Sequence, residues 1–400
     1  MSGRACEGMK PYYQDDQTTI YNGDCREILQ GLPDDSVDAV VTDSPYGLAF
    51  MGKRWDYDVP GVEVWAECLR VLKPGGHLLA FAGTRTQHRM AVRIEDAGFE
   101  IRDMIAWVYG SGFPKSLDVS KAIDKAAGAE REVVGVADVG PDMRGRNFEN
   151  ATGRMVANIT APATESAKQW SGWGTALKPA LEPITVARKP LCGTVAENVL
   201  QYGTGGINVD GCRVGTEERT EERTDTITES GFGANFMDDG WQPSGKTYTK
   251  TVTGRWPANL IHDGSEKVTG LFPETKGQQG AVTGSEPSSK TANAFAEYSA
   301  CSPSELRGDT GSAARFFYTA KADKSDRGHG NNHPTVKPQA LMRYLVRLVC
   351  PPGGVVLDPF GGSGTTAAAA RLEHCRSVLC ELSAEYCDIA VERLRQRVLF

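Results

Sequence analysis

The run from Val355 to Thr366 (VVLDPFGGSGTT) limits the folds open to this chain more than any other stretch. Its apolar, β-branched start predicts a buried strand that ends at Asp358. The glycines that follow predict a tight turn, and residues 367–372 predict a helix. A strand that enters a helix through glycines brings backbone N–H groups and a helix N-terminus close to a ligand. The run therefore predicts an α/β fold with a ligand site at this turn.

Two further features narrow the choice of ligand. The turn lacks the Gly-Lys-[Ser/Thr] signature, whose lysine holds a triphosphate. A second apolar run, residues 377–380, ends at an acidic residue, Glu381. A carboxylate at the tip of the next strand suits ribose hydroxyls. These strand ends favour a ligand with a ribose over one held by its triphosphate.

Strand and helix patterns alternate along the N-terminal half of the chain. Helical patterns at 25–32, 62–72 and 85–97 separate strand patterns at 18–21, 37–42, 77–81 and 100–108. Such alternation is typical of a parallel, doubly wound sheet, which binds ligands at the carboxyl ends of its strands. One of these ends carries Asp43, Ser44, Pro45 and Tyr46. On composition alone, Asp and Pro there are also compatible with an ordinary turn.

Together the two strand ends resemble the β-group of S-adenosylmethionine-dependent amino-methyltransferases of DNA. The glycine turn resembles that family's cofactor loop, Asp-Pro-Phe-x-Gly-x-Gly-Thr-Thr. Residues 43–46 resemble its catalytic Asp-Pro-Pro-Tyr, with Ser44 in place of the first proline. The resemblance implies a circularly permuted, Rossmann-like α/β fold. Its sheet would have seven strands, mostly parallel, with the last hairpin antiparallel.

The resemblance also implies a site for S-adenosyl-L-methionine. Glu381 would meet the ribose and Asp24 the adenine, although Asp24 is equally explained as the N-cap of the next helix. The segment 333–338 resembles one that the family places near the methionine end, which puts Lys337 beside the cofactor carboxylate. The remaining predicted contacts come from the turn itself: Asp358, Pro359, Phe360, Gly361, Gly362, Ser363, Gly364 and Thr365.

Residues 43–46 are the predicted catalytic residues. The exocyclic amine of a nucleobase is a weak nucleophile, because its lone pair is delocalised into the ring. The Asp43 carboxylate and the Ser44 carbonyl would accept its two N–H groups and free that lone pair for in-line attack. Tyr46 would stack on a base flipped out of the duplex. Serine lacks the fixed φ of proline, so position 44 loses rigidity. In the resembled family, an aspartate at position 43 goes mostly with adenine N6.

Contacts with DNA must come from local clusters, because a net charge of −7 excludes a generally basic nucleic-acid-binding protein. Basic residues in predicted loops are the candidates: Lys53, Arg54, Lys115, Arg144, Arg146 and Arg255. For Arg255, packing beneath Trp256 is the alternative.

Changes of periodicity divide the chain into three parts. Residues 1–190 form the catalytic half of a methyltransferase domain, with an inserted loop region at about 136–176. Residues 191–315, rich in Gly, Ser, Thr and acidic side chains, are predicted as an insertion that recognises the target. Residues 316–400 form the cofactor-binding half.

The sequence thus predicts a site-specific enzyme, of the restriction–modification kind, that methylates adenine N6 in double-stranded DNA. A cytosine N4 DNA methyltransferase is the alternative within the same class of enzyme. The alternatives from other classes are an RNA or protein-amide methyltransferase and an inactive DNA-binding relic. Ten cysteines with no Cys-x-x-Cys pair favour free thiols over a metal site. No signal peptide or membrane-length apolar run is present, which predicts a soluble, cytoplasmic protein. The resemblance also suggests a homodimer.

Overall fold

The computed structural model describes residues 10–49, 52, 54–112, 116–141, 154–224, 247–275, 310–321, 323–328 and 330–395. The strands of its central sheet are β1 (Tyr13–Gln14), β2 (Thr18–Asn22), β3 (Val37–Thr42), β4 (Leu72–Phe81), β5 (Glu100–Val108), β8 (Leu181–Arg188), β11 (Leu260–His262), β14 (Tyr318–Thr319), β15 (Val355–Asp358) and β16 (Arg376–Glu381). Their spatial order is β1-β2-β16-β15-β3-β4-β8-β5-β11-β14.

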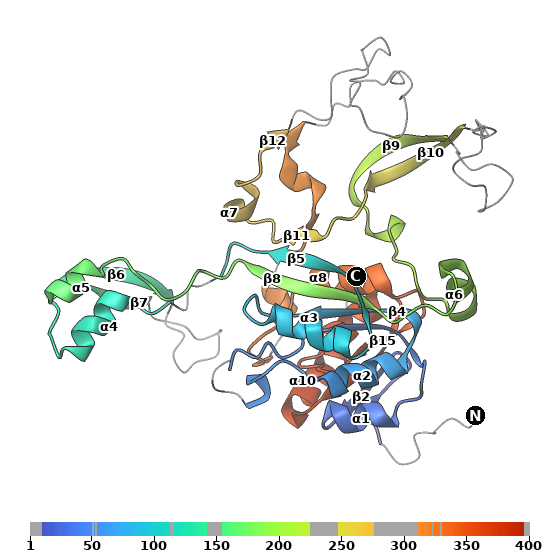
Figure 1. Ribbon diagram of the computed structural model, residues 1–400, viewed down its shortest axis with the longest axis horizontal. Coiled ribbons are helices and arrows are strands. Elements are labelled where there is room, and N and C mark those ends of the chain that lie inside the picture. The colour runs from blue at the N-terminus through green and yellow to red at the C-terminus, as the bar shows by residue number, and fades with distance from the viewer. Residues whose placement is uncertain are drawn as a thin grey trace, which may run out of the picture.

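Helices cover both faces of this sheet (Figure 1). The helices of the described residues are α1 (Cys25–Gly31), α2 (Val62–Val71), α3 (Gln87–Asp96), α4 (Val119–Ala126), α5 (Glu165–Gln169), α6 (Val195–Tyr202), α7 (Glu266–Thr269), α8 (Gln339–Val349), α9 (Thr365–Leu372) and α10 (Ala384–Arg395). Helices α1 to α3 pack on one face and α8 to α10 on the other. None of the helices in the described ranges is long and apolar enough to cross a bilayer.

Strand β3 shows why the sheet is buried between two helical layers. All its residues are buried, as its nearly continuous apolar sequence predicts. Ala39 and Val41 point into the core beneath α8 and α9, and Val37 and Val40 point into the core beneath α1 to α3. From Ala39 to Val41 the alternation follows the two-residue period of a strand, and Val37 departs from it next to a register shift between Val37 and Ala39.

The predicted doubly wound, mostly parallel sheet is confirmed, with three strands more than the predicted seven. The predicted strands form its centre, β1 extends one edge, and β11 and β14 extend the other. Strand β8 is reversed, antiparallel to both β4 and β5, and the edge strand β1 is antiparallel to β2. Strand β4 begins at Leu72, five residues before the strand predicted at 77–81, and β11 joins the sheet from the segment predicted as a separate insertion.

The reversal of β8 sends the chain to the amino ends of the parallel strands. Its last residue, Arg188, pairs with Glu100 at the start of β5. Helix α6 follows there, where Asn198 Nδ2 donates to the Pro74 carbonyl at the start of β4. The hairpin of β9 (Val214–Thr224) and β10 (Thr247–Arg255) comes next, and β11 returns the chain toward the carboxyl ends.

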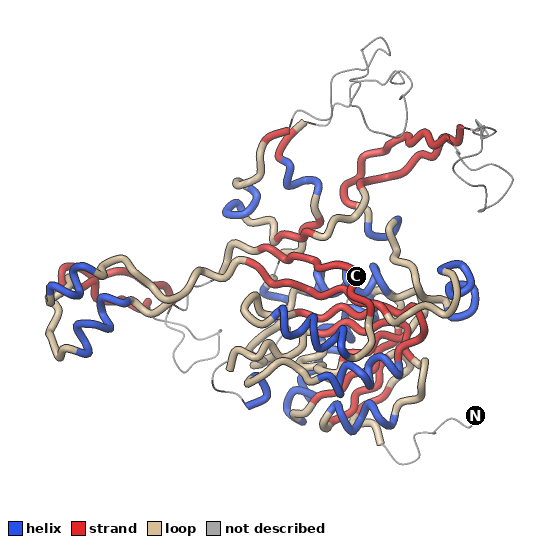
Figure 2. The backbone as a smooth tube through the Cα atoms, in the orientation of Figure 1, coloured by secondary structure: helices blue, strands red, loops and turns tan. Residues whose placement is uncertain are grey.

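A separate arm leaves the carboxyl end of β5 and returns at the start of β8 (Figures 1 and 2). It consists of α4, α5 and an antiparallel hairpin of β6 (Val133–Pro141) and β7 (Arg154–Thr160). The described part of 136–176 is therefore ordered structure rather than the predicted loop. The fully buried Asp124 holds the arm together, because it accepts hydrogen bonds from Arg131, Thr164 and the Ala163 N–H.

A buried carboxyl at the end of β15 ties three elements together. Asp358 Oδ1 accepts from the Thr42 hydroxyl of β3 at 2.7 Å and from the Phe360 N–H at 3.0 Å. Its Oδ2 accepts from the Thr366 hydroxyl of α9 at 2.5 Å. Burial raises the pKa of Asp358 to about 6, despite these three hydrogen bonds, which lower it.

The raised pKa predicts a pH-dependent cost for Asp358. Between about pH 4 and pH 6 the unfolded chain loses this proton while the folded chain keeps it, so the unfolded state is increasingly favoured. The stability of the wild type relative to Asp358→Asn should therefore fall by about 3 kcal/mol across this window and stay level above it.

Urea unfolding of both proteins without ligand, from pH 4 to pH 8, measures this difference. The other carboxyl groups are common to both chains and cancel. A difference in unfolding free energy that does not change with pH would show that burial does not control the titration of Asp358.

Candidate active site

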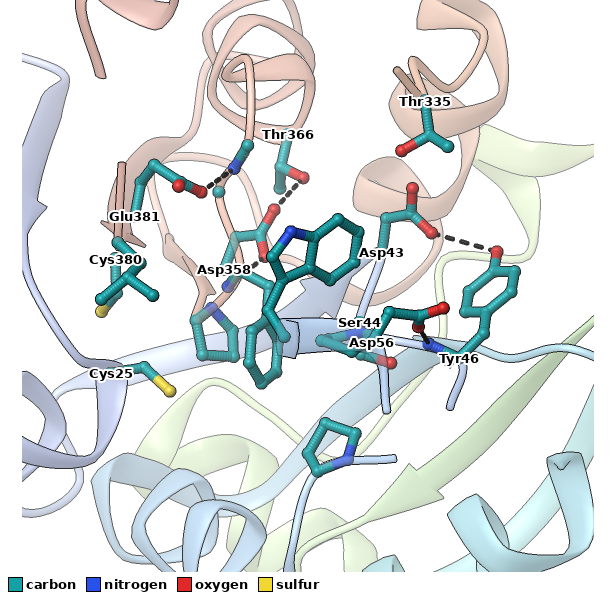
Figure 3. Close-up of a pocket in the computed structure, with 18 of the residues that line it drawn as sticks. Cys25, Asp43, Ser44, Tyr46, Asp56, Thr335, Asp358, Thr366, Cys380 and Glu381 are labelled. Atoms are coloured by element: carbon teal, nitrogen blue, oxygen red, sulfur yellow. Dashed lines mark hydrogen bonds between the residues drawn. The ribbon is translucent and has the colours of Figure 1, made fainter. Parts of the chain in front are cut away.

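The carboxyl ends of the parallel strands open into a cavity of about 740 Å³. Strands β3 and β15 are hydrogen-bonded neighbours, with Ala39 opposite Val356 and Val40 opposite Leu357. Residues that follow the two strands therefore lie beside each other. The cavity is lined by the predicted residues Asp24, Asp43, Ser44, Pro45, Tyr46, Lys337, Asp358, Pro359, Phe360, Gly361, Gly362, Ser363, Thr365 and Glu381 (Figure 3). Of the predicted catalytic and cofactor residues, Gly364 alone is outside the lining.

One end of the cavity carries two carboxylates. Glu381 accepts from the Gly362 N–H at 2.8 Å and from the Ser383 N–H at 2.7 Å, one bond on each oxygen. Burial raises the pKa of Glu381. Asp24 caps α1 by accepting from the Arg26 N–H, and it also pairs with the Arg26 guanidinium, which lowers the pKa of Asp24. Because Asp24 also lines the cavity, the N-cap role and the ligand role are compatible.

The glycine turn is packed closely against the segment that contains His333. Gly362 has a φ of +51°, and a Cβ there would lie 3.1 Å from His333 Nε2. His333 Nδ1 lies 2.5 Å from the Thr335 carbonyl, and its ring packs edge-on against Tyr386. Any side chain at position 362 would therefore disturb this wall of the cavity.

The other end of the cavity is organised around Asp43. Asp43 Oδ1 accepts from Lys337 Nζ at 2.8 Å and from the Tyr46 hydroxyl at 3.0 Å. Within the described part of the chain, Asp43 Oδ2 has no hydrogen-bond partner. This carboxylate thus keeps one oxygen available to a ligand in the cavity (Figure 3).

Lys337 lies at the Asp43 end of the cavity. Its ammonium contacts Asp43, and it also lies 3.2 Å from Glu182 Oε2. Burial acts to lower the pKa of Lys337, but the two carboxylates outweigh it and raise that pKa. The predicted contact between Lys337 and a cofactor carboxylate stays a prediction.

Ser44 is anchored by its own side chain. Its hydroxyl donates to the Phe81 carbonyl at the end of β4, at 2.9 Å, and the residue is buried. The loss of rigidity expected from replacing proline is therefore offset by a hydrogen bond to the neighbouring strand. Within the described residues, the Ser44 carbonyl accepts no hydrogen bond.

Asp56 is a site residue that the sequence did not reveal. Its buried carboxylate accepts from three consecutive backbone N–H groups, those of Tyr46, Gly47 and Leu48, at 2.7, 2.9 and 3.2 Å. Gly47 has a φ of +67°, and a Cβ there would lie 2.9 Å from the Val59 backbone nitrogen. Asp56 thus fixes the path of the loop directly after Asp43. A lone acidic residue ten positions away gives no sequence signal for such a contact.

Of the predicted DNA contacts, only Arg54 and Arg255 lie within the described residues. Lys53, Lys115, Arg144 and Arg146 lie outside the described residues. Arg54 begins the short helix η2 (Arg54–Asp56), whose Trp55 lines the cavity.

Arg255 lies at the end of β10, where its guanidinium carbon is 4.1 Å from the centre of the Phe316 ring. This packing contact is with Phe316 rather than Trp256, and the predicted DNA contact of Arg255 stays a prediction.

Comparison with known proteins agrees with this geometry. Residues 37–127 and 217–392 match the family model described as DNA methylase. The Type II methyltransferase M.HindIII of Haemophilus influenzae is 22% identical over 419 residues, covering 94% of each chain. The DNA adenine methyltransferase YhdJ of Escherichia coli is 41% identical over 63 residues, 16% of this chain and 21% of that one.

Solved structures of DNA methyltransferases are also similar over most of their length. The M1.HpyAVI complex with SAM is 16% identical with a TM-score of 0.38, covering 94% of this chain and 99% of that one. The cytosine-N4-specific PvuII methyltransferase is 14% identical with a TM-score of 0.47, covering 98% and 92%. The family match spans more than half of the sequence, and the chain belongs to the DNA methylase family, the S-adenosylmethionine-dependent amino-methyltransferases that act on adenine N6 or cytosine N4.

Proposed function

We propose that this enzyme methylates the N6 amine of adenine in double-stranded DNA, with the target base flipped out of the helix. One observation carries the proposal: the Asp43 carboxylate and the glycine turn after β15 line the same cavity. A stacked base cannot bring its amine to a carboxylate inside a cavity, so a duplex substrate requires flipping.

The lining of the cavity fits S-adenosylmethionine. Glu381 holds one backbone N–H on each oxygen, which leaves further acceptor positions for ribose hydroxyls. Asp24 lines the part of the cavity that we assign to the adenine of the cofactor, and the N-terminus of α9 follows the glycine turn. When bound, this cofactor supplies an electrophilic methyl group on a sulfonium. We assign its binding to Asp24, Glu381, residues 358–363 and Thr365.

Asp43 and Ser44 have the geometry to activate an amine. Asp43 Oδ2 and the Ser44 carbonyl are two acceptors on consecutive residues, and both are unused within the described part of the chain. If each accepts one N–H of the exocyclic amine, the nitrogen lone pair leaves conjugation with the ring and points at an electrophile. Fixed acceptors of this kind act by positioning and electrostatics, without reorganisation during the reaction.

Adenine is favoured over cytosine by two observations. Asp43 occupies the first position of the catalytic motif, where aspartate goes mostly with adenine in the resembled family. A relative that matches over 63 residues is named as a DNA adenine methyltransferase. We also retain Lys53, Arg54, Lys115, Arg144 and Arg146 as proposed DNA contacts, because the segments that carry them leave the sheet at the cavity edge.

Incubation with labelled S-adenosylmethionine and genomic DNA, followed by mapping of modified bases, tests this function. We expect label on adenine N6 within one recurring sequence. The Asp43→Ala variant should lose transfer by a factor of about 10³ or more, because an essential acceptor is gone, while its cofactor affinity changes little.

Asp34→Ala is a suitable control, since Asp34 pairs with Arg70 on the surface and does not line the cavity. Label on cytosine N4 would overturn the choice of adenine. Full activity of Asp43→Ala would overturn the assignment of the catalytic residue.

Asp56 predicts a separate effect on the loop. Asp56→Asn keeps the size of the side chain but faces one or more of the three N–H groups with an amide NH₂. We expect kcat to fall by about 10-fold or more, because charge-assisted hydrogen bonds of this type contribute about 1.5–3 kcal/mol. Cofactor affinity, measured by calorimetry, should stay within about twofold of wild type, since Asp24 and Glu381, the carboxylates assigned to cofactor binding, lie at the other end of the cavity.

Asp58→Asn is the matched control, two residues away in the same loop. Asp58 also lines the cavity, but its carboxylate pairs with Arg93 and accepts from the Val59 N–H, and it does not accept from the Tyr46–Leu48 N–H groups. Equal losses of kcat in both variants would show that the contact from Asp56 has no special role.

A further inference from the structure

Glu182 is a half-buried carboxylate of the cavity that the proposed mechanism has not used. It lies in β8, whose reversed direction brings its first residues to the carboxyl ends of the parallel strands. Glu182 Oε2 accepts from the Tyr46 hydroxyl at 2.9 Å and lies 3.2 Å from Lys337 Nζ. Its side chain is 20% exposed, and that of Lys337 is 9% exposed. Burial and Glu182 raise the pKa of the neighbouring Tyr109 to about 12.

Glu182 and Asp43 share the same two hydrogen-bond donors. Lys337 Nζ contacts both carboxylates, and the Tyr46 hydroxyl lies within 3.0 Å of both. A hydroxyl has only one proton to donate, so Tyr46 can satisfy one carboxylate at a time. One ammonium between two carboxylates leaves this group with a net charge of about −1.

The position of Lys337 follows from this balance. Its ammonium also lies 4.9 Å from the centre of the Phe81 ring and 5.2 Å from that of Tyr46, so little water surrounds it. A buried ammonium with a single carboxylate would form a neutral pair, and that carboxylate would be largely neutralised. The second carboxylate allows Lys337 to remain buried while Asp43 keeps one unengaged oxygen.

We propose that Glu182 is a positioning residue for methyl transfer. It pairs with the Lys337 ammonium and accepts from the Tyr46 hydroxyl, so that neither donor is bound to Asp43 alone and the Asp43 carboxylate stays open to the target amine. This inference rests on the function proposed above.

The reaction itself explains why the net charge matters. With the cofactor bound, the amine nitrogen would form the new N–C bond as the S–C bond breaks, and the electron pair of the broken bond would stay on the sulfur as a neutral thioether. The nitrogen would then carry the positive charge until it releases one proton to water. A net negative group beside that nitrogen stabilises the charge that develops there. Without Glu182, Lys337 would pair with Asp43 alone and reduce this stabilisation.

Glu182→Gln removes the charge with little change in size. We expect its kcat to fall about 10- to 100-fold, with the cofactor dissociation constant within about twofold of wild type. Glu182→Asp, which keeps the charge, should recover part of the rate. The control Glu100→Gln removes a carboxylate from the other end of the same β5–β8 pair, where Glu100 contacts Arg188, and should leave kcat unchanged.

A double variant separates charge balance from a purely structural role. In Glu182→Gln/Lys337→Met, both the second carboxylate and the ammonium are gone, so Asp43 is again the single net charge. The charge argument expects this protein to be more active than Glu182→Gln alone, by about fivefold or more. A double variant equal to or slower than Glu182→Gln would overturn it, as would wild-type kcat in Glu182→Gln. Thermal unfolding and cofactor binding verify that each variant is folded.

The outcomes also separate this inference from the proposed function. If wild type methylates DNA and Asp43→Ala does not, but Glu182→Gln matches wild type, the inference alone fails. If wild type transfers no methyl group to any DNA, the proposed function fails, and the inference that rests on it fails with it.

Discussion

The parallel pairing of β3 with β15 is the contact on which the rest of the site depends. The two strands lie more than three hundred positions apart in the sequence, yet Val40 pairs with Leu357 at the centre of the sheet. Burial of their apolar side chains on both faces fixes this register, because a shift by one residue would exchange the two faces. Asp358 adds a polar contact to Thr42 at the point where the strands end. Whatever follows these strands is then held at one edge of the sheet.

At that edge, buried charge rather than apolar packing determines the geometry. Asp43, Glu182 and Lys337 come from β3, β8 and the segment before α8, and each would be costly to bury alone. Lys337 and the Tyr46 hydroxyl contact both carboxylates, while Asp43 Oδ2 has no hydrogen-bond partner within the described residues. Asp56 acts in the same way on the backbone that follows. The residues around Asp43 are thus positioned by the carboxylates of Asp56 and Glu182, which come from other segments of the chain.

The sequence predicts those parts of the molecule whose structure depends on residues close together in the chain. Apolar periodicity predicts β3 and β15, and the glycine turn and residues 43–46 are visible as motifs, because each lies within a few residues of a strand end. Asp56 and Glu182 carry no such signal, since their contacts arise only when distant segments meet. Strand β11 is too short for a period to emerge. The hairpin of the arm is missed for another reason: Val133, Val134 and Val136 are exposed, so burial imposes no alternation on them.

The direction of β8 also decides which insertions can approach a substrate. The arm leaves β5 and enters β8 at the edge that holds the cavity. Helix α6 and the hairpin of β9 and β10 follow the other end of β8, and only β11 brings the chain back. If DNA binds as proposed above, it would lie along the cavity edge, where the arm leaves the sheet and the β9–β10 hairpin does not. The described parts of the segment 191–315 therefore lie at both ends of the parallel strands. The position of this segment in the sequence, between the two motifs, does not by itself place it over the site.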